Sequence, residues 1–117
     1  MKEHPMSEIE IRLAMARALM DKHGLQDWAV SFQDLSRVPS MSLTGMSYGA
    51  FGVCRFFEKE IAIDLKLIGR PMKCRQTVLH EIAHAVFGRP GHGRDWLKVA
   101  RRVGCTKRSL RVYTNAY

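Results

Sequence analysis

The stretch TVLHEIAHAVFGRPGHG, residues 77–93, sets three histidines and one glutamate among apolar residues and glycines. From about Met72 to Phe87 the sequence is nearly apolar at helical spacing, which predicts a buried helix. Gly88 can end this helix, and Pro90 cannot continue it. Ionisable side chains in such a helix destabilise a fold unless they are compensated, so their spacing is the first feature to explain.

His80 and His84 are four residues apart, so a helix projects both imidazoles from one face. Two ring nitrogens on one face can reach a single ion at about 2.0–2.1 Å. Glu81 lies about 100° around the helix from His80, where it could contact a metal-bound water without being a ligand. Zinc lowers the pKa of bound water toward about 7, and a carboxylate can take its proton as the water attacks a carbonyl. This H-E-x-x-H pattern is typical of zinc metalloproteases, and the alternative is a set of core hydrogen bonds.

A catalytic zinc ion takes three protein ligands and keeps one position open. We expect His92, eight residues after His84, to be the third ligand, because the glycines around it let the backbone turn back toward the helix. Asp95 is the weaker rival, since its position also suits an acid in the first turn of a helix. His4 and His23 are expected to be surface or helix-end residues.

The length and composition limit the classes of protein to consider. A chain of 117 residues predicts a single domain, residues 1–117. No apolar run approaches the roughly 20 residues that span a bilayer, and the charged N-terminus has no apolar core of a secretory signal. Cys54, Cys74 and Cys105 form no C-x-x-C pair, which argues against a disulfide framework and a zinc ribbon. We therefore expect a cytoplasmic protein without membrane association.

The positive charge is concentrated in one half of the chain. Residues 1–64 carry seven Lys/Arg and nine Asp/Glu, a net charge of −2. Residues 65–117 carry twelve Lys/Arg and two acids, a net charge of +10. This basic half also holds the histidine motif, so the asymmetry favours a polyanionic partner, above all nucleic acid. A solvated basic surface without a partner is the alternative.

Other patterns predict the remaining elements of an α+β domain. Ser7 and Glu10 form a capping box that begins a helix ending near Gly24. Two apolar segments, 50–57 and 60–64, predict a hairpin joined at Glu58–Lys59. The other expectations are a strand at 28–32, a loop at 37–49, a short helical turn at 65–69, a helix at 94–103 and a tail of undetermined structure from 105.

The order of these motifs resembles the SprT-like zinc metalloproteases. Their pattern is H-E-x-x-H, a variable loop, and then H-G-x-x followed by an aromatic residue. Here it is HEIAH at residues 80–84 and HGRDW at residues 92–96. The upstream segments HGLQDWAVSF and GVCRFFEKEIAIDLKLI are similar to the family's first strand and hairpin. The resemblance covers roughly residues 9–104.

The resemblance implies a minimal zincin fold with an N-terminal helix, a small three-stranded sheet, an active-site helix and a C-terminal helix. It implies that His80, His84 and His92 bind Zn²⁺ and that Glu81 is the general base. It also implies cleavage of DNA-bound or DNA-crosslinked proteins, with activation by DNA and a role in DNA–protein crosslink repair.

Many members of the family continue into a zinc ribbon, and we expect a departure from that pattern because the sequence contains no C-x-x-C pair. Contacts to single-stranded DNA, or to DNA of single-stranded character, are therefore expected from the basic half itself. The expected phosphate contacts are Arg94, Lys98, Arg101, Arg102, Lys107, Arg108 and Arg111.

The residues alone leave two questions open: whether Trp96 contacts a base, and which side chain donates a hydrogen bond to the developing oxyanion. Trp96 could stack on an unpaired base, but its place on the apolar side of a helix favours packing in the core. Tyr113, Tyr48 and Arg111 are candidate donors to a developing oxyanion.

Three functions are therefore compared. The first is a zinc metalloendopeptidase acting on DNA-associated proteins. The second is a zinc peptidase without nucleic-acid dependence, which cleaves a regulatory protein. The third is a non-catalytic nucleic-acid-binding module stabilised by zinc, which the presence of Glu81 disfavours because a structural site needs no general base.

Overall fold

The computed structural model describes residues 5–42 and 45–114, with the backbone alone over residues 40–42 and 45–48 and at positions 112 and 114. The elements follow one another as α1 (Glu8–Lys22), β1 (Ala29–Gln33), β2 (Pro39–Ser42), β3 (Gly45–Tyr48), β4 (Gly52–Arg55), β5 (Glu60–Asp64), the 3₁₀ turn η1 (Leu65–Leu67), α2 (Pro71–Phe87), α3 (Arg94–Val103) and α4 (Lys107–Thr114). The α+β class and the small three-stranded sheet are confirmed.

Helix α1 begins at the predicted capping box. The Glu10 backbone N–H donates to Ser7 Oγ at 3.3 Å, and the Ser7 N–H donates to Glu10 Oε1 at 3.0 Å. The helix ends at Lys22, and Gly24 adopts a φ of +81°, which favours glycine. Ala16 and Met20 on its inner face are fully buried in the core shared with α2.

The three-stranded sheet has the order β1-β5-β4. Strand β5 runs parallel to β1 and antiparallel to β4, so the predicted 50–64 hairpin is confirmed. Ile61, Ala62 and Ile63 are fully buried because β5 is the central strand and is covered on both faces. Strand β4 is an edge of this sheet, and α2 packs against it.

A buried carboxylate fixes the turn that leads from the sheet into α2. Asp64, at the end of β5, is 2% exposed and accepts hydrogen bonds from the backbone N–H groups of Leu35 at 2.8 Å and Lys66 at 2.9 Å. These two bonds tie the loop after β1 to η1. The chain then enters α2 at Pro71, whose fixed φ suits the first position of a helix.

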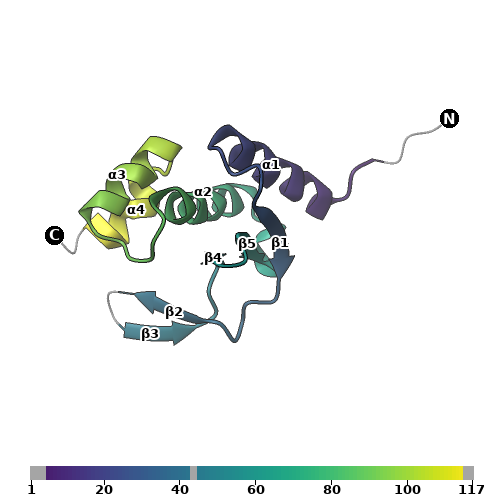
Figure 1. The fold of residues 1–117 in the computed structure, drawn as a ribbon. Coiled ribbons are helices and arrows are strands. Elements are labelled where there is room, and N and C mark those ends of the chain that lie inside the picture. Colours follow the sequence, from purple (N-terminus) through teal and green to yellow (C-terminus); the bar gives the residue numbers. More distant parts are fainter. Residues whose placement is uncertain (1–4, 43–44, 115–117) are drawn as a thin grey trace.

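Helix α2 lies at the centre of the molecule, with α1 on one side and α3 and α4 toward its C-terminal end (Figure 1). It ends at Gly88, which has a φ of +87° and donates its N–H to the His84 carbonyl at 2.8 Å. Side chains from α2 and α3, among them Val78, Ile82, Trp96 and Ala100, form much of the core. Among the described residues, no helix combines the length and apolar character needed to cross a bilayer.

The predicted loop at 37–49 is wrong, because it contains the antiparallel pair β2–β3, which forms a sheet of its own (Figure 1). Its pairing runs from Pro39 opposite Tyr48 to Ser42 opposite Gly45. Backbone hydrogen bonds hold such a pair without an apolar alternation, so the Ser- and Gly-rich sequence concealed it.

The C-terminal tail forms helix α4, for which the sequence predicted no structure. The Ser109 N–H donates to Thr106 Oγ1 at 3.1 Å, which satisfies one of the free donors at the start of this helix. Leu110 on α4 is buried, so the helix is held by packing against the core as well as by its cap.

Candidate metal centre

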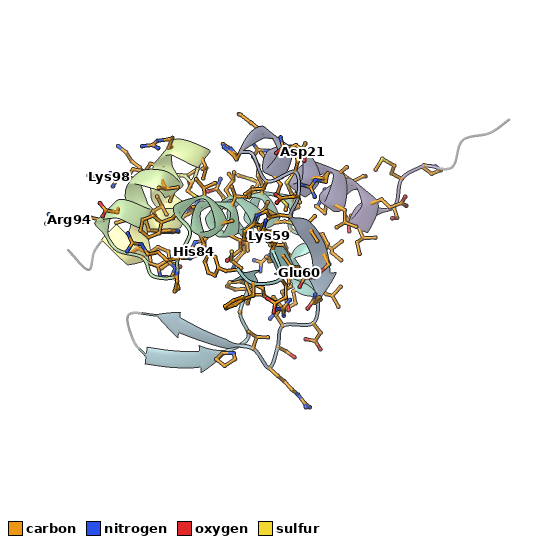
Figure 2. All side chains as sticks on the ribbon, in the orientation of Figure 1. Asp21, Lys59, Glu60, His84, Arg94 and Lys98 are labelled. Atoms are coloured by element: carbon orange, nitrogen blue, oxygen red, sulfur yellow. The ribbon has the colours of Figure 1, made fainter. Side chains whose placement is uncertain are left out.

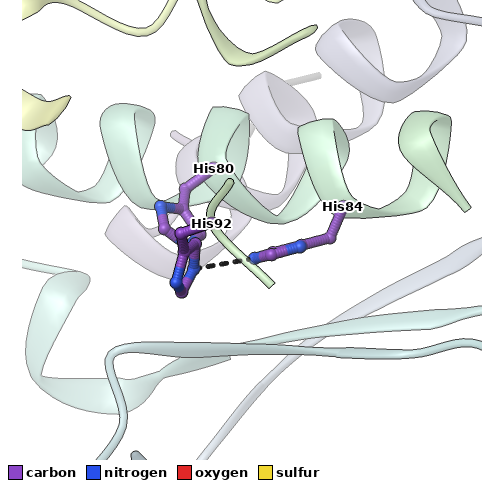
Figure 3. A group of neighbouring side chains, drawn as sticks. All are labelled: His80, His84 and His92. Carbon is purple, nitrogen blue, oxygen red and sulfur yellow. Dashed lines mark hydrogen bonds between the residues drawn. The ribbon is translucent and has the colours of Figure 1, made fainter. Parts of the chain in front are cut away.

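Three imidazoles converge where α2 faces the loop before α3 (Figure 3). Nε2 of His92 lies 3.1 Å from Nε2 of His80 and 3.1 Å from Nε2 of His84. One potential ligand atom from each residue lies within 4.8 Å of the other two. Nitrogens that bind one tetrahedral ion at 2.0–2.1 Å are themselves about 3.3 Å apart, so this arrangement suits a single metal ion.

The helix and the loop place these side chains by different means. His80 and His84 share a face of α2 because they are one helical turn apart. The loop then reverses direction at Gly88 and Gly91, whose φ values of +87° and +104° are unfavourable for other residues. The reversal returns His92 to the face that carries the other two imidazoles, as the glycines around it predicted.

The histidine environment favours the form that binds metals. Burial, followed by the charges of His84 and His92, lowers the pKa of His80 to about 3. Burial, followed by the charge of His92, lowers the pKa of His84 to about 4. Burial also lowers the pKa of His92. All three rings are therefore neutral at pH 7, with nitrogen lone pairs available to an ion.

Glu81 lies beside the three imidazoles and is only 6% exposed. Its Oε2 is 4.0 Å from Nε2 of His80. Burial raises the pKa of the Glu81 carboxyl to about 8. Without a metal ion the Glu81 carboxyl is therefore mostly protonated at pH 7, and a cation bound beside it would favour the carboxylate that a general base needs.

Gly52 on the edge strand β4 makes room for Glu81. A Cβ at this position would lie 2.9 Å from Thr77 Cγ2 and 3.1 Å from both Cγ and Oε2 of Glu81. The strand therefore approaches the carboxylate closely only because residue 52 has no side chain. Sequence reasoning missed this residue, because no local pattern predicts which part of α2 the strand meets.

An aromatic wall packs behind the histidines. Trp96 is fully buried, and its ring centroid lies 4.7 Å from those of His80 and His92 and 5.0 Å from that of His84. The expectation that Trp96 belongs to the core is confirmed, and its burial excludes stacking on a base. Tyr113 of α4 adds a second ring, 4.2 Å from His92.

The other expected site residues are distributed as follows. Among the candidate oxyanion donors, Tyr113 lies beside the histidines, Arg111 is exposed on α4, and the side chain of Tyr48 lies outside the described residues. Asp95 is exposed in the first turn of α3 and is not part of the histidine group. His23 caps the C-terminal end of α1, as expected for a helix-end residue, and His4 lies outside the described residues.

The seven basic side chains expected to contact nucleic acid are all exposed, on α3 and α4. Figure 2 shows Arg94 and Lys98 projecting outward from α3. The three cysteines carry free thiols.

Comparison with known families agrees with this architecture. The model of the SprT-like family matches residues 22–116, which include all three histidines and Glu81. Neither the curated proteins nor the solved structures gave a significant match to the chain. The family match spans most of the chain, so this protein belongs to the SprT-like family.

Proposed function

We propose that this protein is a zinc-dependent metalloendopeptidase that acts on DNA-associated proteins, in the cytoplasm and as a single catalytic domain. The observation that carries the proposal is the convergence of three neutral imidazoles beside a buried carboxylate. His80, His84 and His92 would hold the ion, and Glu81 would be the general base. Membership of a metalloprotease family supports the same assignment.

Bound zinc would supply an acidified water and a Lewis acid for the peptide carbonyl. The protein's part is to hold and move the proton. Glu81, which lies against Gly52 of β4, would take a proton from the attacking water, and its raised pKa would favour passing that proton to the leaving amine. Tyr113, whose ring centroid lies 4.2 Å from that of His92, would be the donor to the developing oxyanion.

The position of β4 at the edge of the sheet is evidence for a polypeptide substrate. Among the described residues β4 pairs only with β5, so the hydrogen-bonding groups of its other edge have no strand partner. A peptide added there as a further strand would pass Gly52 and so come close to Glu81. Backbone pairing of this kind accepts many sequences, which suits an enzyme that acts on varied proteins.

The positive charge of the basic half of the chain is evidence for a nucleic-acid partner. Residues 65–117 carry twelve Lys/Arg and only two acids, and one of these, Glu81, is buried. The remaining surface of this half therefore carries a large excess of positive charge. Such a surface attracts a polyanion and would bring proteins bound to the same DNA within reach.

The test is cleavage of a DNA-binding protein such as a histone, with and without single-stranded DNA, by the wild type and by Glu81→Gln. We expect cleavage by the wild type with DNA, and none by the variant. Glu81-dependent cleavage that ignores DNA would favour a zinc peptidase without nucleic-acid dependence. Equal cleavage by both proteins would refute the catalytic assignment.

A further inference from the structure

An open pocket with a volume of about 310 Å³ lies between the C-terminal end of α2 and the N-terminal end of α3. Phe87, the loop that follows it and the first turn of α3 form its walls. The same loop carries His92, so the pocket and the candidate metal centre share one segment of backbone. Any ligand held in this pocket would therefore also hold the loop.

The side chains that line the pocket favour an anion. Arg89 and Arg94 both line it, against the single carboxylate of Asp95, so the lining carries a formal charge of +1. Neither arginine forms an ion pair with any residue that the structure describes. The Arg89 guanidinium lies 4.8 Å from the centre of the Phe87 ring, which holds it at the pocket wall.

The pocket also offers hydrogen-bond donors without acceptors. Helix α3 begins at Arg94, and its N-cap residue, Gly93, has no side chain to bind the free N–H groups of the first turn. These main-chain donors are available to an anion in the pocket.

We propose that this pocket binds a phosphate group of a nucleic-acid strand and that the bound phosphate strengthens zinc binding through the loop that holds His92. A phosphate presents several acceptor oxygens, which suit two arginines and the N-terminus of a helix. The inference rests on the proposed metal site and adds to it a specific point of contact with nucleic acid.

Phosphate binding and zinc binding are coupled because both restrain the loop that holds His92. A phosphate bound to Arg89 and Arg94 restrains the loop at both ends of the segment that contains His92. Less conformational freedom is then left to lose when the ion binds, so the ion binds more tightly. Linkage is reciprocal: zinc must strengthen phosphate binding by the same factor, typically about fivefold or more.

The first test measures binding of a labelled oligothymidine strand to the zinc-loaded protein by fluorescence anisotropy over a range of salt concentrations. The variant is Arg89→Ala/Arg94→Ala. The matched control, Lys22→Ala/Arg37→Ala, removes two exposed positive charges from the acidic half of the chain. The pocket variant should bind more weakly than the control, with a salt slope reduced by about 0.7 for each phosphate that it no longer neutralises. Equal affinities and equal slopes would overturn the proposed phosphate site.

A second variant, which is expected to strengthen binding, excludes misfolding as the explanation for weaker binding by the first. Asp95→Asn removes the carboxylate that lines the pocket and leaves both arginines in place. It should bind the oligothymidine severalfold more tightly than the wild type. Unchanged or weaker binding would contradict the assignment of the pocket to a phosphate.

The second test measures zinc transfer to a chelator, with no protease substrate present. Saturating oligothymidine should lower the extent of transfer from the wild type by about fivefold or more, and from Arg89→Ala/Arg94→Ala much less. Transfer that ignores the oligonucleotide would overturn the coupling. Protection by inorganic phosphate but not by oligothymidine would overturn the choice of nucleic acid. Failure of the proposed protease function would instead appear as a lack of cleavage, which neither test uses.

Discussion

Replacing Glu81 by Gln should stabilise the metal-free protein while it abolishes catalysis. Burial raises the pKa of the Glu81 carboxyl from 4.5 to about 8. The folded protein therefore holds this proton more tightly than the unfolded chain does. That stabilisation is fully present below pH 4.5 and is lost as the pH rises toward 8. A glutamine has the same shape and carries no charge, so it avoids the loss.

The size of the effect follows from the two pKa values. One pKa unit corresponds to about 1.4 kcal/mol, so the difference between 4.5 and pH 7 amounts to about 3 kcal/mol. Above pH 8 the full difference between the two pKa values amounts to about 5 kcal/mol. Glu81→Gln should therefore gain little at pH 4.5 and progressively more in neutral and alkaline solution. Bound zinc should reduce this gain, because its charge favours the carboxylate.

The assay is urea unfolding of chelator-treated protein at about pH 5, 7 and 8.5, together with cleavage by the zinc-loaded protein. Glu58→Gln is the matched control, because Glu58 is exposed to solvent on the β4–β5 turn. We expect a pH-dependent gain in stability for Glu81→Gln alone, and a loss of turnover of about 10²- to 10⁴-fold. Identical unfolding of wild type and variant at all three pH values would refute the argument from burial. Full activity of the variant would refute the role as base.

Three further predictions concern the metal and its surroundings. His92→Ala should lower the zinc content measured by atomic absorption, whereas Asp95→Ala should retain the zinc. The reverse result would show that Asp95, and not His92, is the third ligand. Burial lowers the pKa of His80 to about 3 and that of His84 to about 4. Protons compete with the metal for these two rings only below those values. Zinc that stays bound during dialysis should therefore persist well below pH 6.5. Zinc release centred at or above pH 6.5 would contradict this. Gly52→Ala should reduce kcat and cost about 1–3 kcal/mol in thermal unfolding, because its Cβ would lie 2.9 Å from the Thr77 methyl group. Gly69→Ala, with only one atom within 4 Å, should change neither.

Local sequence signals predicted much of the fold. The capping box at Ser7, the hairpin from residue 50 to residue 64 and the limits of α2 and α3 were all confirmed. Such features depend on contacts between residues a few positions apart, which a sequence displays directly. The start of α4 carried a similar signal at Thr106 and Ser109, which sequence analysis overlooked.

Two features of the fold, the β2–β3 pair and the pairing of β1 with β5, were not predicted from the sequence. The β2–β3 pair depends on backbone hydrogen bonds and has no alternation of apolar residues to reveal it. The parallel pairing of β1 with β5 joins segments about thirty residues apart in the sequence, so no local pattern encodes it.

Local sequence was enough to place two histidines and a glutamate on neighbouring faces of one helix, because helical geometry fixes the positions of residues 80, 81 and 84. Only the tertiary structure brought His92 to within 3.1 Å of both imidazoles, packed Trp96 behind them and brought Gly52 against Glu81. Those contacts join residues that are distant in the chain, and they form because the sheet and helices α2 and α3 bury their apolar faces against one another. That burial depends on the whole set of buried side chains, and no short motif specifies it.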